Sequence, residues 1–196
     1  MGTKRETTRG HARKRLVDAF WTLLDAMPYE RMTVAMVARC AGVHRNAFYY
    51  HYSDLDDLAG DAIAARIPFD RLCATLRTLR RQDTAATTPF TATQLSLADT
   101  AARLVTGSHG DARLRRVAKD TAIDMALASY GLDRHDLDGD EAIGLELAMD
   151  GIAGVMAMPD LKRHHPGSVM DLWRSPWVAN ALAHVDTIAR GALDRQ

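Results

Sequence analysis

Cysteines, aromatic residues and long apolar runs are all scarce in this chain of 196 residues. The 2 cysteines, Cys40 and Cys73, are too few and too far apart for a disulfide framework or a zinc site. No segment approaches the apolar length of a membrane span, and no apolar stretch follows the basic N-terminus. These absences predict a cytoplasmic protein with reduced thiols and no membrane partner.

Motifs of enzyme chemistry are missing as well. The sequence contains no phosphate-binding glycine loop, no HExxH motif and no nucleophile elbow. An acidic segment at residues 133–141 suggests a calcium loop, but with Gly139 as the invariant glycine its first and twelfth ligands would be Arg134 and Leu145. Neither side chain can coordinate calcium. We therefore expect no catalytic residue, no metal and no cofactor, and a protein that is not an enzyme.

The residues that are present predict an all-α fold. Apolar residues make up 47% of the chain and recur at helical spacing, whereas no strand pattern and no internal repeat is found. Ser53 with Asp56, and Asp138 with Glu141, are typical of helix N-termini, and Ser175-Pro176 is a further helix start. Helices are expected at about residues 8–27, 34–41, 44–50, 54–67, 69–81, 90–105, 111–130, 138–158 and 176–194.

The most specific pattern lies in residues 32–58, which predict a helix, a glycine turn and a second helix. One apolar face of the first helix has the spacing i, i+3, i+4, i+7, formed by Val34, Val37, Ala38 and Ala41. Thr33 can cap its first turn, and Gly42 can adopt the left-handed conformation that ends it. Two short helices in this arrangement form a helix-turn-helix, whose second helix enters the major groove of DNA.

The second helix, from His44 to Tyr50, has an inner and an outer face. Ala47 and Phe48 can face the core, while Arg45 with Tyr49, and Asn46 with Tyr50, are i, i+4 pairs on the outer face. Arginine suits guanine and asparagine suits adenine when they reach base edges. The set predicted to contact DNA is Arg13, Thr33, His44, Arg45, Asn46, Tyr49, Tyr50 and His51.

Charge is distributed unevenly, although the formal net charge is zero. Residues 1–53 hold 9 Lys and Arg against 4 Asp and Glu, and residues 54–196 hold 16 against 21. The basic run before and within the first long helix suits phosphate contacts, which supply affinity without sequence information. A solvated helix face is the alternative interpretation of such a run on its own. Beside the helix-turn-helix, the charge split favours a small DNA-binding region joined to a larger domain with another task.

Residues 9–58 resemble the DNA-binding domain of the TetR family of bacterial transcriptional regulators. The motifs that carry the resemblance are Thr33-Val34, Val37-Ala38, Ala41-Gly42-Val43, Phe48-Tyr49, His51-Tyr52 and Leu58. The resemblance implies an all-α homodimer with a three-helix DNA-binding domain at residues 1–53, a connecting helix at 54–67 and a ligand-binding and dimerisation domain at 68–196. It also implies binding of a near-palindromic operator on double-stranded DNA, and release when a small-molecule effector binds, as for the repressors that make up most of the family.

Within that resemblance, two positions match and two depart. Tyr49 and His51 correspond to positions that usually meet phosphates, although Tyr49 also suits packing and His51 also suits a helix C-cap. His44 stands where the family usually has a small hydroxylated residue, and Leu55 stands where it usually has lysine. The loss of that lysine predicts one fewer phosphate contact. A helical ligand-binding or protein-interaction dimer that has lost DNA binding is therefore the alternative function.

The C-terminal half offers candidates for dimerisation and for ligand binding. The helix expected at 142–158 is apolar on nearly every side, so it should be buried all round, and Gly144, Gly151 and Gly154 would admit another helix. In the family the last two long helices pair with those of a second subunit; closing the subunit's own core is the alternative. Candidate ligand-binding residues are Met125, Met149, Met156, Trp173 and Trp177, which also suit ordinary core packing.

Overall fold

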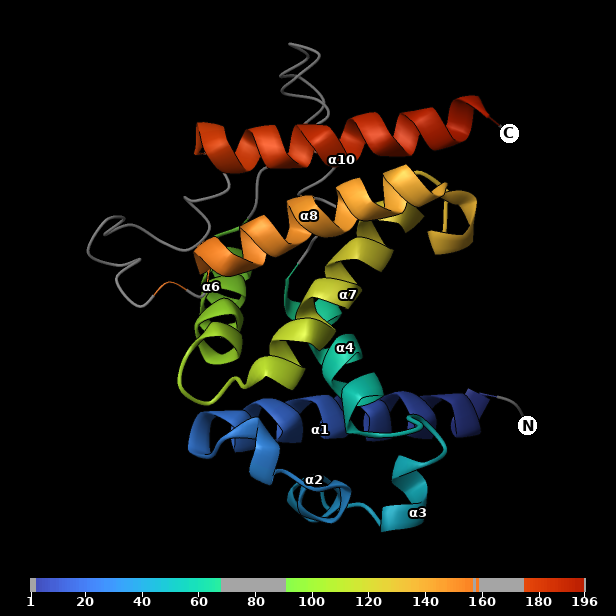
Figure 1. The fold of residues 1–196 in the computed structure, drawn as a ribbon. Helices are drawn as coiled ribbons and strands as arrows, with labels where there is room; N and C mark the ends of the chain where they lie inside the picture. The colour runs from blue at the N-terminus through green and yellow to red at the C-terminus, as the bar shows by residue number, and fades with distance from the viewer. Residues whose placement is uncertain (1–2, 68–90, 157, 159–174, 196) are drawn as a thin grey trace. The chain divides into compact units, whose positions relative to one another are not determined.

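The computed structural model describes residues 3–67, 91–156, 158 and 175–195, and their regular structure is entirely helical (Figure 1). The expected all-α class is confirmed for these residues. The helix expected at 69–81 lies outside them. Among the described helices, none combines the length and the apolarity that crossing a membrane requires.

The chain divides into two compact units. The first comprises residues 1–65 with 104–118, and the second comprises residues 66–103 with 119–196. Helices α6 (Ala92–Thr106) and α7 (Ala112–Ala128) each contribute residues to both units. The sequence did not predict that residues 104–118 group with the N-terminal helices.

The first unit contains short helices around one long one (Figure 1). Its elements are α1 (Thr3–Ala26), η1 (Tyr29–Arg31), α2 (Val34–Cys40), α3 (Arg45–Phe48) and α4 (Leu55–Arg66). Helix α2 packs against both α1 and α3. The helices begin and end close to the predicted residues, except that α1 starts five residues earlier and α3 is shorter at both ends.

A continuous apolar core holds these helices together. On α1 the fully buried leucines are Leu16 and Leu24, whereas Leu23 and Met27 are only half-buried. Leu16, Phe20 and Leu24 follow one another at intervals of four residues, so they share one side of the helix, and that side is buried. Other buried side chains of this core are Val37, Phe48, Leu58, Ala62 and Ile63.

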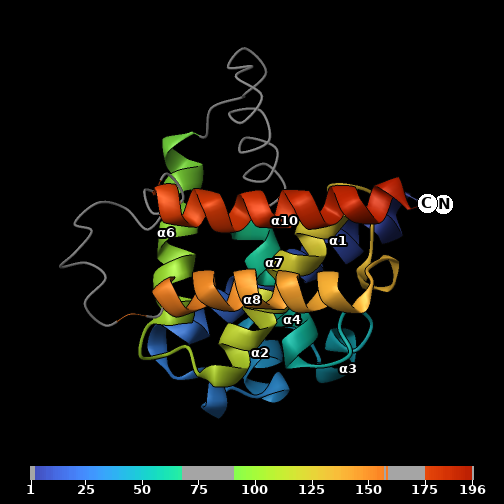
Figure 2. The ribbon, with the colours of Figure 1, turned by 45° about the horizontal axis from the view of Figure 1, so that its top comes forward.

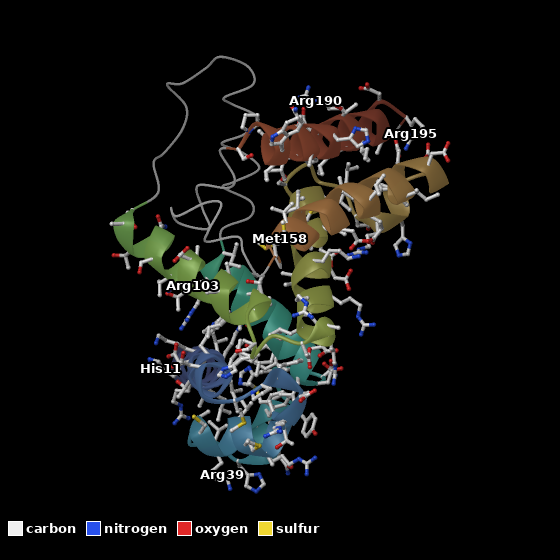
Figure 3. The ribbon with its side chains drawn as sticks, turned by 60° about the vertical axis from the view of Figure 1, so that its left-hand side comes forward. His11, Arg39, Arg103, Met158, Arg190 and Arg195 are labelled. Atoms are coloured by element: carbon white, nitrogen blue, oxygen red, sulfur yellow. The ribbon has the colours of Figure 1, made fainter. Side chains whose placement is uncertain are left out.

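In the second unit, helices α8 (Gly139–Met156) and α10 (Pro176–Asp194) lie side by side (Figure 2). They are antiparallel, because Arg195 after α10, labelled in Figure 3, is paired with Glu141 in the first turn of α8. A Cβ on Gly144 would lie 3.1 Å from the Ile188 Cδ1, so this glycine allows the close approach of the two helices.

The N-termini of these two helices differ in how they are capped. The predicted capping box is confirmed at α8, where Glu141 N donates to Asp138 Oδ1 at 2.9 Å and Asp138 N donates to Glu141 Oε2 at 3.1 Å. Helix α10 begins at Pro176 as predicted, but the Ser175 side chain makes no capping hydrogen bond. The fixed backbone of a proline at N1 therefore defines this helix start without a serine cap.

The expectation that α8 is buried all round is wrong for the single chain. Leu145 and Met149 are buried, but Ile143 is 68% exposed and Leu147 is 74% exposed. Ile143 and Leu147 are four residues apart, so they lie on one face of the helix. An apolar face of α8 therefore points to solvent.

Candidate nucleic-acid interface

Helix α2 begins with a side-chain cap that the sequence predicted. Thr33 has an extended backbone (φ −129°, ψ 154°), and its Oγ1 accepts a hydrogen bond from Met36 N at 3.3 Å. This bond satisfies one of the amide groups that a helix leaves open in its first turn. Val37 and Ala38 are buried, which fixes the face of α2 that points inward.

The turn between α2 and α3 depends on Gly42. Its φ is +63°, a left-handed conformation in which a side chain is unfavourable. Gly42 N donates to Arg39 O at 3.1 Å, and Val43 N donates to Ala38 O at 2.9 Å. These two bonds form a Schellman motif, which ends α2 and turns the chain into α3.

Helix α3 is only four residues long and is capped by His44. The His44 backbone is extended (φ −70°, ψ 145°), and its Nδ1 accepts a hydrogen bond from Asn46 N at 3.3 Å. An imidazole nitrogen can accept only while it carries no proton. His44 therefore provides the capping acceptor that a hydroxylated residue would otherwise provide at this position.

Phe48 anchors α3 to the core, and the residues around it are exposed. Phe48 is fully buried, and its ring centroid lies 5.7 Å from that of the buried Tyr52. Arg45 and Asn46 are exposed on α3, and Tyr50, the residue after its C-cap, is 77% exposed. The sequence predicted this division between an inner phenylalanine and an outer polar and aromatic surface.

Tyr49 packs on the core, as one of its two interpretations predicted, and its contact with a phosphate stays a prediction. Its ring packs edge-on against Phe48, with centroids 5.5 Å apart and planes at 78°, yet the residue is 50% exposed. Arg45 Nη2 donates to the Tyr49 hydroxyl oxygen at 3.3 Å, and Arg45 Cζ lies 5.9 Å from the ring centroid. The distance to the ring is within the range of a cation–π contact. Arg45 and Tyr49 thus form one unit on the outer surface.

His51 lies at the end of this segment. Its backbone N donates to Phe48 O at 2.9 Å, which closes the turn after α3, and its ring is half-buried with its centroid 6.3 Å from that of Tyr52. The backbone position favours the helix-terminal interpretation of His51. A phosphate contact by its half-exposed ring stays a prediction.

Arg13 has a partner within the unit that the sequence did not reveal. Its Nε donates to Asp61 Oδ2 at 2.9 Å, and its second guanidinium nitrogen bonds the other carboxylate oxygen. The Tyr52 hydroxyl also donates to Asp61 Oδ2, at 2.5 Å. The hydrogen bond to Asp61 raises the pKa of Arg13, and burial followed by the same carboxylate raises the pKa of Tyr52. Arg13 therefore links α1 to α4, a role distinct from the predicted phosphate contact.

Other cations of this unit are exposed. Lys14 pairs with Asp18 at 2.7 Å in a solvent-exposed i, i+4 contact, which contributes little to stability. Arg15 on α1 and Arg39 at the end of α2 are exposed as well (Figure 3 labels Arg39). Arg15 lies beside the turn at Gly42, since a Cβ on Gly42 would lie 3.9 Å from Arg15 Nη1.

The start of α4 is held by a second tyrosine–carboxylate–arginine cluster. The Tyr29 hydroxyl donates to Asp56 Oδ1 at 2.6 Å, and Arg113 Nε donates to Asp56 Oδ2 at 2.8 Å. Burial, and then the bond to Asp56, raises the pKa of Tyr29, so its hydroxyl stays a donor. The predicted cap formed by Ser53 and Asp56 is wrong, because Asp54 Oδ1 accepts from Asp57 N at 2.9 Å instead.

The predicted ligand-binding residues differ from one another in how exposed they are. Met149 is 5% exposed and belongs to the core, Met125 is half-buried, and Trp177 is 82% exposed on α10. Trp173 and the Met156 side chain lie outside what the structure describes. The described members of this set thus differ in exposure, and the ligand site stays a prediction. Within the described residues, no group of three or more His, Cys, Asp or Glu is arranged to hold a metal ion.

Comparison with protein-family models and with curated protein sequences finds no match to this chain. The resemblance to TetR regulators therefore depends on the motifs in residues 33–58.

Proposed function

We propose that this protein is a sequence-specific DNA-binding transcriptional regulator in which α2 and α3 form a helix-turn-helix. The observation that carries the proposal is the surface of α3. Exposed Arg45 and Asn46, followed by Tyr49 and Tyr50, project from a short helix that the buried Phe48 fixes to the core. Such a surface presents guanidinium, amide and phenol groups to base edges and phosphates.

The charge of the first 53 residues supports this proposal. They carry a formal excess of cations, whereas the remainder of the chain carries an excess of carboxylates. Exposed Lys14, Arg15 and Arg39 belong to the same unit as α3 and would contact phosphates on either side of the groove. The family resemblance supports the same assignment from the motif.

We further propose that the protein acts as a homodimer on a near-palindromic operator. The apolar side chains of Ile143 and Leu147 are exposed on α8, and the neighbouring Gly151 and Gly154 are exposed with nothing within 4 Å of an added Cβ. A second copy would bury this face, as an isologous interface does in a two-fold dimer. By resemblance, a small-molecule effector would bind the C-terminal unit and release DNA, and the protein would act in the cytoplasm.

The alternative, a helical dimer that has lost DNA binding, is favoured by one observation. Leu55 is half-buried in the first turn of α4, next to Asp54, Asp56 and Asp57. A lysine there would contact a DNA phosphate, whereas these carboxylates would repel a phosphate. Asp56 is, however, paired with Arg113, which offsets one of the three charges.

The two functions are separated by selecting duplexes from a random-sequence library with the purified full-length chain. The proposal predicts enrichment of one near-palindromic sequence, bound with an affinity that falls steeply with salt. Asn46→Ala should then relax the preference at defined positions, whereas Arg39→Ala should weaken binding to all sequences alike. If no sequence is enriched at moderate salt, the DNA-binding proposal is wrong and the alternative is favoured.

A further inference from the structure

We propose that Tyr49 is a positioning residue for Arg45, and that the Arg45–Tyr49 pair makes the protein select guanine at one position of each half-site. The inference rests on the proposed DNA-binding function and adds a residue-level source of specificity to it. Its basis is the double contact between the two side chains, a hydrogen bond from Arg45 Nη2 to the Tyr49 hydroxyl oxygen and a guanidinium close to the ring.

The pair is supported from the core outward. Phe48 is fully buried and packs against Tyr52, which is 4% exposed. The Tyr49 ring rests edge-on against Phe48, and the Arg45 guanidinium in turn lies near the Tyr49 ring. An arginine side chain otherwise samples many rotamers, and ordering it on binding is costly. Prior contact with Tyr49 reduces that cost, because the guanidinium is oriented before DNA arrives.

The bond to Tyr49 leaves enough donors for a base. A guanidinium has five N–H groups, and the Tyr49 contact uses one of them on Nη2. Guanine presents two acceptors, N7 and O6, in the major groove, and the remaining donors can bind both. Adenine offers the N7 acceptor beside an amino donor, cytosine offers an amino donor, and thymine offers only the O4 acceptor, so none of them gives a guanidinium two acceptors. The pair should therefore favour a G·C pair over the others.

This role differs from the phosphate contact that the family resemblance implies for Tyr49. A phosphate contact adds affinity for every sequence and does not depend on Arg45. A positioning role changes the selectivity and disappears when Arg45 is absent. The two roles predict opposite results in a double-mutant cycle.

The test uses the full-length chain with Arg45→Ala, Tyr49→Phe and the double variant. Binding is measured on the duplex selected by the unmodified protein, and on duplexes in which each guanine in turn is replaced by 7-deazaguanine, which lacks the N7 acceptor. For the unmodified protein we expect one guanine per half-site at which the replacement weakens binding about 5-fold or more. Arg45→Ala should abolish that effect. Tyr49→Phe should reduce it by about 2-fold or more, and should change nothing further in the Arg45→Ala background.

Tyr50→Phe is the matched control, because it removes the same hydroxyl from the adjacent, more exposed residue. Its effect, whatever its size, should be the same with and without Arg45. Thermal unfolding of each variant shows whether the fold is retained. The claim that Tyr49 positions Arg45 is wrong if Tyr49→Phe weakens all duplexes equally in both backgrounds. It is also wrong if the unmodified protein selects a sequence but is insensitive to every 7-deazaguanine. In either case the DNA-binding proposal stands. If no sequence is selected, both are wrong.

Discussion

At the scale of single residues, both units contain clusters of one kind, made of a tyrosine, an aspartate and an arginine. In each cluster the phenol donates to one carboxylate oxygen, and the arginine bonds the carboxylate and offsets its charge. The clusters are Tyr29–Asp56–Arg113, Tyr52–Asp61–Arg13 and Tyr130–Asp186–Arg190. Each joins residues that are distant in sequence, so these clusters fix the packing of helices.

Tyr29→Phe should destabilise the protein. Tyr29 is 2% exposed, and its hydroxyl is a 2.6 Å donor to Asp56, so its removal costs a hydrogen bond to a charged group, about 1–3 kcal/mol of unfolding free energy. Urea denaturation at neutral pH measures the change. The matched control is Tyr50→Phe, at a residue that is 77% exposed, which should alter the unfolding free energy by less than about 0.5 kcal/mol. Equal effects of the two substitutions would contradict the structural role of Tyr29.

Glu141 should contribute stability that acid removes. The hydrogen bond from Arg195 is the main cause that lowers the pKa of Glu141 below its ordinary value of 4.5. Because the folded state binds this proton less readily than the unfolded chain, the contribution is complete above pH 4.5 and is lost as the pH falls through the lower, folded pKa.

Glu141→Gln tests this contribution through urea midpoints at pH 7 and at pH values below 4.5. The variant should be less stable than the unmodified protein at pH 7, and the difference should shrink on acidification. Asp140→Asn on the same turn, at an exposed residue, is the control for the loss of one carboxylate from this helix end. A difference for Glu141→Gln that is independent of pH would exclude the ion pair as its source.

At the scale of elements, the turn after α2 depends on one backbone conformation. Gly42→Ala should destabilise the first unit by about 1–2 kcal/mol, because a Cβ is unfavourable at a φ of +63° even though no neighbour lies closer than 3.9 Å. Thermal or urea unfolding measures this loss of stability. Gly139→Ala at the start of α8 is the control: nothing lies within 4 Å of its added Cβ, its φ is not positive, and alanine favours a helix, so it should be neutral or stabilising. If Gly42→Ala left the unfolding free energy unchanged, the turn would not depend on glycine at this residue.

Helix α3 marks the limit of prediction at this scale. Its four residues are too few for a stable isolated helix, so the sequence could give its place but not its length. The structure shows that a His44 side-chain cap and the buried Phe48 hold it. The start of α4 was misassigned for a related reason. Asp56 was available as a local cap, but its distant partners Tyr29 and Arg113 engage it instead.

At the scale of the whole molecule, the exposed face of α8 bears on the proposed dimer. Leu147→Glu places a charge on an apolar residue that is 74% exposed in one chain and would be buried between two. We expect it to convert a dimer into a monomer in sedimentation equilibrium, and to weaken operator binding because one chain contacts only one half-site.

Ala128→Glu is the control for this change, since it introduces the same charge at an exposed residue at the end of α7. It should leave the sedimentation behaviour unaltered. A protein that is monomeric without any substitution, or a Leu147→Glu variant that remains dimeric, would contradict the use of this face.

The sequence by itself determined the features that depend on neighbours in the chain: helical periods, the Thr33 cap, the capping box at Asp138 and the turn at Gly42. The tertiary structure decided which distant groups meet. Arg13 is paired with Asp61, 48 residues away, and Asp56 with Arg113, 57 residues away. Local pattern sets which residues form a helix face, because backbone geometry is periodic. Only packing decides what that face contacts, because helices from any part of the chain can supply the partner.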